Sequence, residues 1–509
     1  MRRKRLLIVA LVLAALPITA FLLVRYLLGS DLVRTTLERQ LTARFGQPVH
    51  IRAATAGLYP RAAIRLQDVT IGAPAVVELS EMRLVTGWRG LISRVVTDAE
   101  VLISKGTIRL PLTLPPAPAE PAADAAAPAG AAISIVSIRA IEIHELTLSA
   151  GGHSVVIDLD SSIEGDRLDI ARATLRAGST RLDASGRLTS IAKMEGAFDA
   201  KADAIDLDEA ITIASALAAP APATPAASAP KHRTGGSSMH LVIKATAPKA
   251  AYATYALDDL ATTIDLVPGR LTLSPLSVRT FGGGFQGRLD VDTSRDEPVL
   301  RVSGRAEGLD VAALLQASGS PGGITGRLSG TVAVSASGTE IDPLIRSSRG
   351  SIAATVADGK IPGLEMVRPI VLAFGKPSGA PPAGSGSAFS RLGGTFAIAG
   401  GSLTSTDLAM SSRDFDLAGR GSMQLASGGV AARVEVVLSS ELTAQAGTDL
   451  RRYAQQDGRV VVPATIGGTL NQPTVSLDVA SATRRALENE LRRRTTTIMD
   501  QLFKRKRQN

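Results

Sequence analysis

The chain has 509 residues, 45% of them hydrophobic, which is enough for a sizeable core, and it contains no cysteine. The missing cysteines leave the redox compartment open. The net charge is +9, but it resides in the first five residues and in residues 484–509, which leaves the body of the chain close to neutral. A neutral body with basic ends is typical of the flanks of a membrane protein and argues against nucleic acid as a partner.

Residues 6–24 form an uncharged apolar run, LLIVALVLAALPITAFLLV. At about 1.5 Å per residue a helix of this run spans roughly 28 Å, close to the hydrocarbon core of a bilayer. The basic residues before it place the N-terminus in the cytoplasm. Residues 1–28 therefore read as a cytoplasmic tip and a transmembrane anchor. A cleaved signal peptide is the alternative, weakened by the length of the run and by a poor cleavage motif at Ile18 and Ala20.

Residues 30–110 begin with a short helix and continue as strands. Val33, Leu37, Leu41 and Phe45 recur every four residues, and glycine and proline follow directly. This helix is expected either to close or seat a sheet near the membrane or simply to pack as an ordinary helix. The following stretches, such as AAIRLQDVTI, alternate in the manner of half-buried strands.

Three stretches rich in proline, alanine, glycine and serine interrupt the strand pattern. Residues 111–132 and 217–238 read as extended linkers, and residues 375–388 as a flexible loop. They divide the body into a β segment over 133–216 and a longer β module over 239–480. In residues 481–509 the apolar residues recur with a helical period, which predicts a basic amphipathic tail. This tail is expected to lie on an anionic membrane surface or dock on a partner, or else to be a solvated terminal helix.

The longest regular pattern covers residues 324–425, where apolar and polar residues alternate with a period of two and the pattern returns after each turn. It predicts a long run of antiparallel strands with one apolar and one polar face. The apolar face must be covered, either by a second sheet in a dry core or by a bound apolar molecule. Successive side chains of a strand alternate between its two faces, and this odd–even parity gives the residues expected to line the apolar face. They are Ile324, Leu328, Val332, Val334, Ile352, Val356, Phe396, Ile398, Leu408, Met410, Phe415 and Leu417.

Motifs for catalysis, nucleotide binding or metal binding are missing from the sequence. There is no nucleophile elbow and no P-loop, and the five histidines lack ligand spacing. Asp158 with Asp160, and Asp290 with Asp292, could serve a glycosidase or a hard cation. They alternate with apolar residues, however, as the solvent face of a strand does. The sequence predicts a protein that is not an enzyme and has no cofactor or metal site.

The chain resembles the AsmA family of Gram-negative envelope proteins in four segments taken in order. These are GQPVHIRAATAGLYPRAAIRLQDVTIG, LSVRTFGGGFQGRLDVDTSRDEPVLRVSGRAEGLDVAALLQ, ITGRLSGTVAVSASGTEIDPLIRSSRGSIAATVADGKIPGLEMV and GGTFAIAGGSLTSTDLAMSSRDFDLAGRGSMQL. The resemblance implies an inner-membrane anchor, a periplasmic body and a sheet curled into a taco-like groove with a chorein-like N-terminal element. The resemblance also implies a role in phospholipid traffic or outer-membrane homeostasis. It does not imply any catalytic residue.

The expected function is non-enzymatic: the apolar groove shields phospholipid acyl chains and supports lipid transport between the inner and outer membranes. The expected partners are phospholipids, the inner membrane, and outer-membrane or periplasmic proteins. The alternative is a structural factor with a dry core, whose sheet edges assist the assembly of outer-membrane proteins. An envelope hydrolase would need a clustered acid and base, which the sequence does not show.

Overall fold

The structure is a computed structural model in which the chain forms two compact units. It describes residues 34–35, 38–39, 41–43, 46–57, 61–87, 95–110, 134–135, 137–218, 239–295, 297–319, 323–362, 364, 386–445 and 455–478. Unit 1 comprises residues 1–253 and 266–268, and unit 2 comprises residues 254–265 and 269–509. Both units consist mainly of β-strands, as the sequence predicts.

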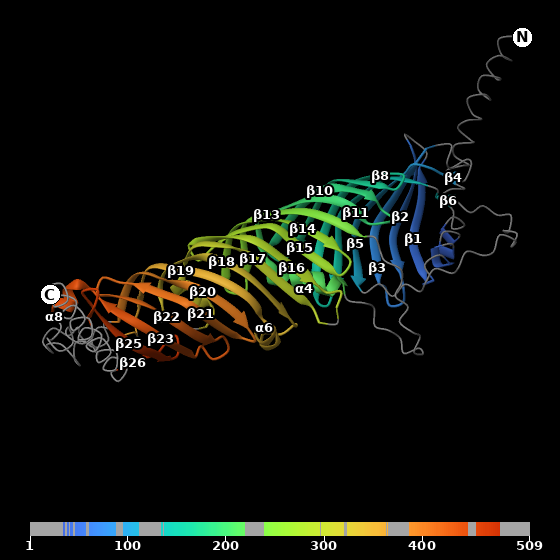
Figure 1. Cartoon of the computed structure of the whole chain (residues 1–509). Helices are drawn as coiled ribbons and strands as arrows, with labels where there is room; N and C mark the ends of the chain where they lie inside the picture. The colour runs from blue at the N-terminus through green and yellow to red at the C-terminus, as the bar shows by residue number, and fades with distance from the viewer. Residues whose placement is uncertain are drawn as a thin grey trace, which may run out of the picture. The chain divides into compact units, whose positions relative to one another are not determined.

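Unit 1 is an open curved sheet whose strands lie side by side from β1 to β13 (Figure 1). Its strands are β1 (Val49–Gly57), β2 (Ala62–Ile71), β3 (Val77–Thr86), β4 (Val95–Val96), β5 (Ala99–Leu110), β6 (Ser134–Ile135), β7 (Ile138–Ala150), β8 (His153–Glu164), β9 (Arg167–Ala177), β10 (Thr180–Ser190), β11 (Glu195–Ala202), β12 (Ala204–Asp206) and β13 (His240–Tyr252). Helix α4 (Leu207–Ala218) connects β12 to the chain before β13. Successive strands pair in the order β1–β2–β3–β5–β7–β8–β9–β10–β11–β13, and β4 pairs with β6 separately.

Unit 2 repeats this architecture, again with a curved sheet (Figure 1). Its strands are β14 (Tyr255–Val267), β15 (Arg270–Thr280), β16 (Gly283–Asp292), β17 (Val299–Asp310), β18 (Thr325–Ser337), β19 (Arg349–Ile361), β20 (Ser387–Ala399), β21 (Ser402–Ser411), β22 (Phe415–Gln424), β23 (Val430–Leu438), β24 (Gln455–Gln456), β25 (Arg459–Gly468) and β26 (Pro473–Leu477). Short helices α5 (Val311–Ala317), α6 (Ile341–Ser347) and α8 (Ser440–Gln445) lie between strands. From β15 to β23 each strand pairs antiparallel with the next, and β25 and β26 continue the sheet.

The prediction of an entirely antiparallel sheet is wrong at the two Pro/Ala linkers. β5 pairs parallel with β7, and β11 and β12 pair parallel with β13. Parallel neighbours need a crossover connection of about a dozen residues or more, because the chain must return to the same end of the sheet. The predicted linkers 111–132 and 217–238 fall in the connections between these parallel strands. Strands on both sides of each linker are therefore joined in one sheet.

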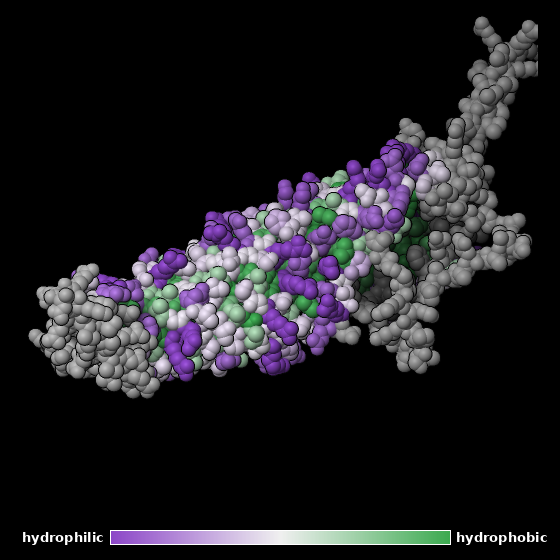
Figure 2. Space-filling model, in the orientation of Figure 1, coloured by the Kyte–Doolittle hydropathy of each residue, from purple (hydrophilic) through white to green (hydrophobic). Residues whose placement is uncertain are grey.

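The predicted division into an apolar and a polar face is confirmed. Along β10 and β18, partly buried side chains alternate with exposed ones, as a half-covered strand requires. Polar side chains (purple) are scattered over the face of unit 2 that is in view in Figure 2. In unit 1 the apolar face forms a core around Val49, Ile51, Ile64 and Leu66 from β1 and β2, joined by Leu146 from β7.

The first edge of the unit 1 sheet is covered by the short N-terminal helix. The described residues between 34 and 43 are helical, and Leu41 packs against the core of unit 1. Glu38 accepts a hydrogen bond from the backbone N–H of Ile51 (2.8 Å), and Thr42 accepts one from that of Val49 (3.0 Å). Side chains thus satisfy donors that an edge strand leaves unpaired. This arrangement supports the interpretation that the helix closes the sheet.

Two further predicted elements, the transmembrane anchor within residues 1–28 and the basic tail over residues 481–509, lie outside the residues that the structure describes. The predicted loop over residues 375–388 is described only from residue 386 onward, and its last two residues belong to β20 instead of a loop. Within the described part of the chain, none of the helices has the length and apolar character needed to span a bilayer.

Three of the four carboxylates in the two acidic pairs, Asp158, Asp290 and Asp292, accept structural hydrogen bonds, and one of the three is buried instead of solvated. Asp158 accepts hydrogen bonds from the backbone of Glu145 (2.9 Å) and from Arg176 (2.6 Å). The prediction is wrong for Asp292, which is only 5% exposed. Its carboxylate accepts hydrogen bonds from the backbone N–H and the hydroxyl of Ser294 and so fixes the turn after β16.

Stability is expected to depend on pH through Asp290. Arg288 donates two hydrogen bonds of 2.7 Å to its carboxylate, which lowers the Asp290 pKa from 3.8 to about 2. Because the folded-state pKa is the lower one, this stabilisation is complete above about pH 4 and is lost as the pH falls towards 2. Asp290→Asn should lower the free energy of unfolding at pH 7 by about 1 kcal/mol, since Arg288 is half exposed and solvent screens the pair. Urea unfolding at pH 7, 4 and 2.5 should show the difference from wild type shrinking. A difference that is constant with pH would contradict this origin.

Candidate functional site

A row of small residues crosses the apolar face of unit 2 at right angles to the strands. Paired residues on neighbouring strands share a face, so the register places small side chains beside one another. Gly330 of β18 pairs with Ala354 of β19, which pairs with Gly394 of β20. On β21 the row steps diagonally to Ser405, whose Oγ would lie 3.1 Å from a Cβ added at Gly394, and it continues through the paired residues Gly421 and Ala432 on β22 and β23. We call these six residues the small-residue row.

Large apolar side chains flank the small-residue row on both sides. On one side lie Val332, Ile352 and Phe396, which pair in turn, and on β21 this side continues with Leu403, whose partner on β20 is Ile398, and then with Met423 and Val430. On the other side lie Leu328, Val356, Leu392, Met410, Leu417 and Val436. On β21, β22 and β23, Leu408, Gly419 and Val434 lie between this second set and the small-residue row. Because the middle row has almost no side chains, the inner face is hollowed along a line that crosses the strands. From β18 to β23 this line covers five strand spacings, or roughly 24 Å at about 4.8 Å per strand.

A β-bulge displaces the row where it crosses β21. The register shifts between Ser405 and Leu408, so both side chains point to the apolar face although their numbers differ in parity. Asp407 in the bulge accepts hydrogen bonds from the backbone N–H of Thr395 (2.8 Å) and from the Ser405 hydroxyl (3.0 Å). The Thr395 bond is the main reason that the Asp407 pKa lies below its ordinary value. The carboxylate thus satisfies a donor that the bulge removes from the ladder.

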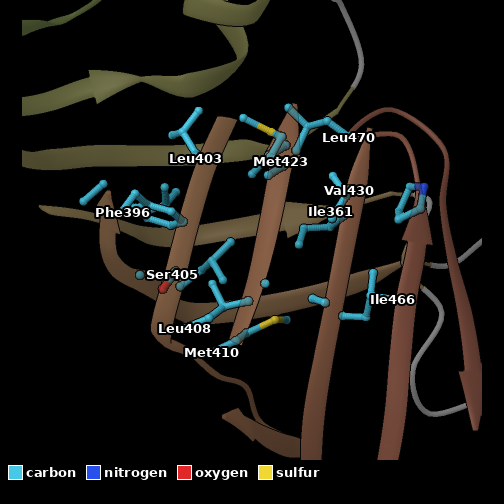
Figure 3. Close-up of a pocket in the computed structure, with 18 of the residues that line it drawn as sticks. Ile361, Phe396, Leu403, Ser405, Leu408, Met410, Met423, Val430, Ile466 and Leu470 are labelled. Carbon is cyan, nitrogen blue, oxygen red and sulfur yellow. The ribbon is translucent and has the colours of Figure 1, made fainter. Parts of the chain in front are cut away.

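The hollow forms a cavity of about 350 Å³ on this face. Phe396 and Leu408 point into it from β20 and β21, with Met423 and Ile466 from β22 and β25 (Figure 3). Its remaining lining is almost entirely apolar, and its few polar side chains, among them Ser405, Ser422 and Thr469, are neutral. A cavity of this size lies within the usual range for small-molecule sites.

Seven of the twelve residues predicted from parity line this cavity. They are Ile324, Ile352, Val356, Phe396, Leu408, Met410 and Leu417. Leu328, Val332 and Val334 share their face, through cross-strand pairs with β19, but lie outside the cavity lining. Ile398, 7% exposed, pairs with Leu403 of β21 and also lies outside the lining.

Phe415 belongs to a dry core beside the cavity. It is 2% exposed and packs in one cluster with Val436, Val460 and Val462, each 1% exposed or less. Leu417 and Met410 contact both environments, because they are members of this cluster and also line the cavity. The C-terminal strands of unit 2 therefore combine a close-packed core with an unfilled apolar space.

Ten apolar residues of the cavity lining are missing from the residues expected from the sequence. They lie partly on the predicted strands and partly on the segments that face them: Ile361, Leu364, Leu392, Leu403, Met423, Val430, Ala432, Ile466, Leu470 and Pro473. Alternation in VAARVEVVL and GGSLTSTDL could have suggested Val430, Ala432 and Leu403. The contribution of the β25–β26 turn, with Leu470, depends on the curl of the sheet, for which the sequence carries no local signal.

The cavity shows no arrangement typical of catalysis. A nucleophile or acid–base pair would need titratable side chains converging on one space, and the cavity lining contains none. Over the part of the chain that the structure describes, no three His, Asp or Glu side chains are grouped closely enough to hold a metal ion. The site can therefore bind an apolar group by exclusion of water, without chemistry.

Comparison with family models gives a match to the AsmA family over residues 177–408. The match begins at the end of β9 and ends at Leu408 within β21. It includes the predicted strands that form one wall of the cavity, whereas β22 to β26 lie beyond it. Comparison with curated proteins and with solved structures gave no match.

Proposed function

The chain belongs to the AsmA family through residues 177–408, and we propose that its apolar cavity shields the acyl chains of phospholipids. The observation that carries this proposal is the unfilled hollow along the small-residue row. A protein interior normally closes such a space, because an empty apolar cavity forfeits contacts on all its walls. A hydrocarbon chain would restore these contacts.

The chemistry of the lining suits a hydrocarbon and provides nothing for a headgroup. Transfer of each methylene from water into an apolar site contributes about 0.8 kcal/mol, so many methylenes add up to strong binding without a specific contact. The neutral lining offers no partner that could replace the hydration of a phosphate, so the phosphate stays in water outside. Because the small-residue row crosses several strands, the bound chain would lie across them and could occupy successive equivalent positions.

In this proposal the protein is a non-enzymatic component of the bacterial envelope. Residues 6–24 anchor it in the inner membrane with the N-terminus in the cytoplasm, and the two β units lie in the periplasm. Its role is to support phospholipid transport between the inner and outer membranes and thereby outer-membrane homeostasis. The uncharged N-terminal run and the family membership support this placement.

A second candidate is a structural factor that assists outer-membrane protein assembly through a sheet edge. The dry core around Phe415 and Val460 favours it, because such a core stabilises the sheet without a lipid. Strand β26 pairs with β25 and, within the described residues, with no other strand. An exposed edge of this kind can accept an added strand from a partner.

Photo-crosslinking distinguishes the two candidates. A photoreactive amino acid at position 396 of the full chain, expressed in a bacterial host, should give phospholipid adducts on irradiation, detectable by mass spectrometry. Position 397 is the matched control, since Ala397 is adjacent on β20, exposed, and on the opposite face. Phe396 is partly buried and lines the cavity, so its adducts should exceed those at position 397 by about tenfold or more.

Equal lipid yields at both positions would indicate contact with bulk membrane instead of a lined site. Absence of lipid adducts at position 396 in a folded chain would contradict acyl-chain shielding. Protein adducts from a photoreactive residue at Ser476 on β26, without lipid at position 396, would favour the assembly candidate.

A further inference from the structure

The small-residue row ends beneath the turn between β25 and β26. Ala432, the last member of the row, pairs with Ile466 near the end of β25. Beyond Ile466, the chain reverses through Thr469 and Leu470 to Pro473 at the start of β26, and all three residues line the cavity. In Figure 3, Leu470 lies at the top of this turn beside Met423. The turn therefore forms the end wall of the cavity.

The same turn approaches Gly323, two residues before β18, although many strands separate the two along the sheet. A Cβ added at Gly323 would lie 2.8 Å from Oδ1 of Asn471 and 3.5 Å from the backbone oxygen of Leu470. The sheet path between them runs through β18, β19, β20, β21, β22, β23, β25 and β26. The contact is thus made by the sheet curling back on itself, so that the cavity is bridged from Gly323 to Asn471.

The bridging contact is weaker than the structure on either side of it. Gly323 is buried but brings no side chain, and Asn471 is exposed at the tip of the turn. The turn is held to the neighbouring turn between β22 and β23, because the N–H of Leu470 donates to the Gly428 oxygen at 3.0 Å and Thr469 forms a β-bridge with Gly429. β26 beyond it has only five residues and pairs on one side with β25. β25 is fixed in the core by Val460 and Val462, whereas β26 and its turn form the edge, which is the kind of element that opens locally before the core does.

We propose that the β25–β26 turn, residues 468–473, is a gate that must part from Gly323 for a hydrocarbon chain to enter or leave the cavity. This inference rests on the proposed function of the cavity. With the gate closed, the small-residue row is a dead end that holds one chain. With the gate open, the row continues to the edge of the sheet, where a chain can pass to a membrane or to a partner.

A reversible bridge across the contact tests the gate. The chain contains no cysteine, so Gly323→Cys with Asn471→Cys introduces a unique pair. Membranes containing the full chain, with the photoreactive residue at position 396, are treated with a short bis-methanethiosulfonate and then mixed with vesicles of phosphatidylethanolamine and phosphatidylglycerol carrying deuterated acyl chains. Irradiation at successive times reports the entry of deuterated lipid. We expect the bridged form to load about tenfold more slowly than the untreated form, and reductant to restore the rate.

The controls separate failure of the gate from failure of the proposed function. Each single-cysteine variant receives the same reagent and should load deuterated lipid at the same rate as without the reagent. Slower loading of a single-cysteine variant would assign the effect to the reagent and overturn the gate. Equal loading of the bridged and reduced forms also overturns the gate, while the lipid adducts leave the proposed function standing. No lipid adduct at position 396 in any form overturns the proposed function and the gate with it.

A wedge in the same place should act in the opposite direction. In Gly323→Val the exposed Asn471 side chain can swing aside, but the two added methyl groups extend beyond a Cβ that already lies 3.5 Å from the backbone oxygen of Leu470, and so they press on the turn. The rate of deuterated lipid entry should rise above that of wild type. A rate equal to or below that of wild type, in a variant with unchanged thermal unfolding, would contradict the gate.

Discussion

Phe415→Ala is expected to lower the free energy of unfolding of unit 2 by about 3–5 kcal/mol. Phe415 is 2% exposed, and its ring packs in the cluster that contains Val436 and Val460. Removal of the ring leaves an apolar void that close-packed neighbours fill only in part. Denaturant unfolding monitored by circular dichroism measures the loss.

Phe396→Ala is the matched comparison, because it is the same substitution on the same face. Phe396 already borders the cavity and is only partly buried, so the loss should stay below about 2 kcal/mol. Lipid loading should show the reverse order: Phe415→Ala should retain it in the folded fraction, whereas Phe396→Ala should alter it. Equal losses of stability would mean that Phe396 is packed as tightly as Phe415, and would count against an unfilled cavity.

This pair also shows what parity could and could not predict about the site. Strand alternation placed Phe396 and Phe415 on one face, and the register confirms that placement through Leu392, Met410 and Leu417. Parity gives the face but not the packing on it, since packing depends on which strands curl together. Phe415 is covered by distant residues such as Val460, while Phe396 is not. The bulge at Asp407 was a further uncertainty, because an extra residue reverses the parity of everything after it.

The fold was predictable where strands follow one another directly. Hairpins such as β16–β17 and β21–β22 carry both their alternation and their turn residues in the sequence. The parallel pairs β5–β7 and β11–β13 were not predictable. A Pro/Ala stretch has the composition of a linker in either case: when the chain crosses back to the same sheet, and when it begins another domain. The contact between Gly323 and Asn471 was equally hidden, since nothing local in either segment records the curl that brings them together.

Ala354→Phe is expected to abolish most lipid loading while leaving the protein folded. Ala354 lies in the small-residue row between Gly330 and Gly394 and lines the cavity. A benzyl group placed there would occupy part of a hollow of about 350 Å³ and block the line across the strands. Because the group enters empty space, the free energy of unfolding should change by less than about 1.5 kcal/mol. Lipid adducts at position 396 should fall about tenfold or more, since a competing side chain is held there permanently.

Ala353→Phe provides the control, with the same substitution one residue earlier on β19. Ala353 is exposed and points to the opposite face, so its variant should load lipid at the wild-type level. The two variants carry the same substitution on the same strand, so composition and β-propensity change equally in both. A difference in lipid loading between them therefore reports the face of the sheet on which the ring is placed. If both variants lost lipid, the cause would be distortion of β19, and the small-residue row would not be the path of the chain. If neither did, the hydrocarbon would have to lie elsewhere on the apolar face. Loss in Ala354→Phe alone places the acyl chain on the small-residue row, because that row is what the added ring fills.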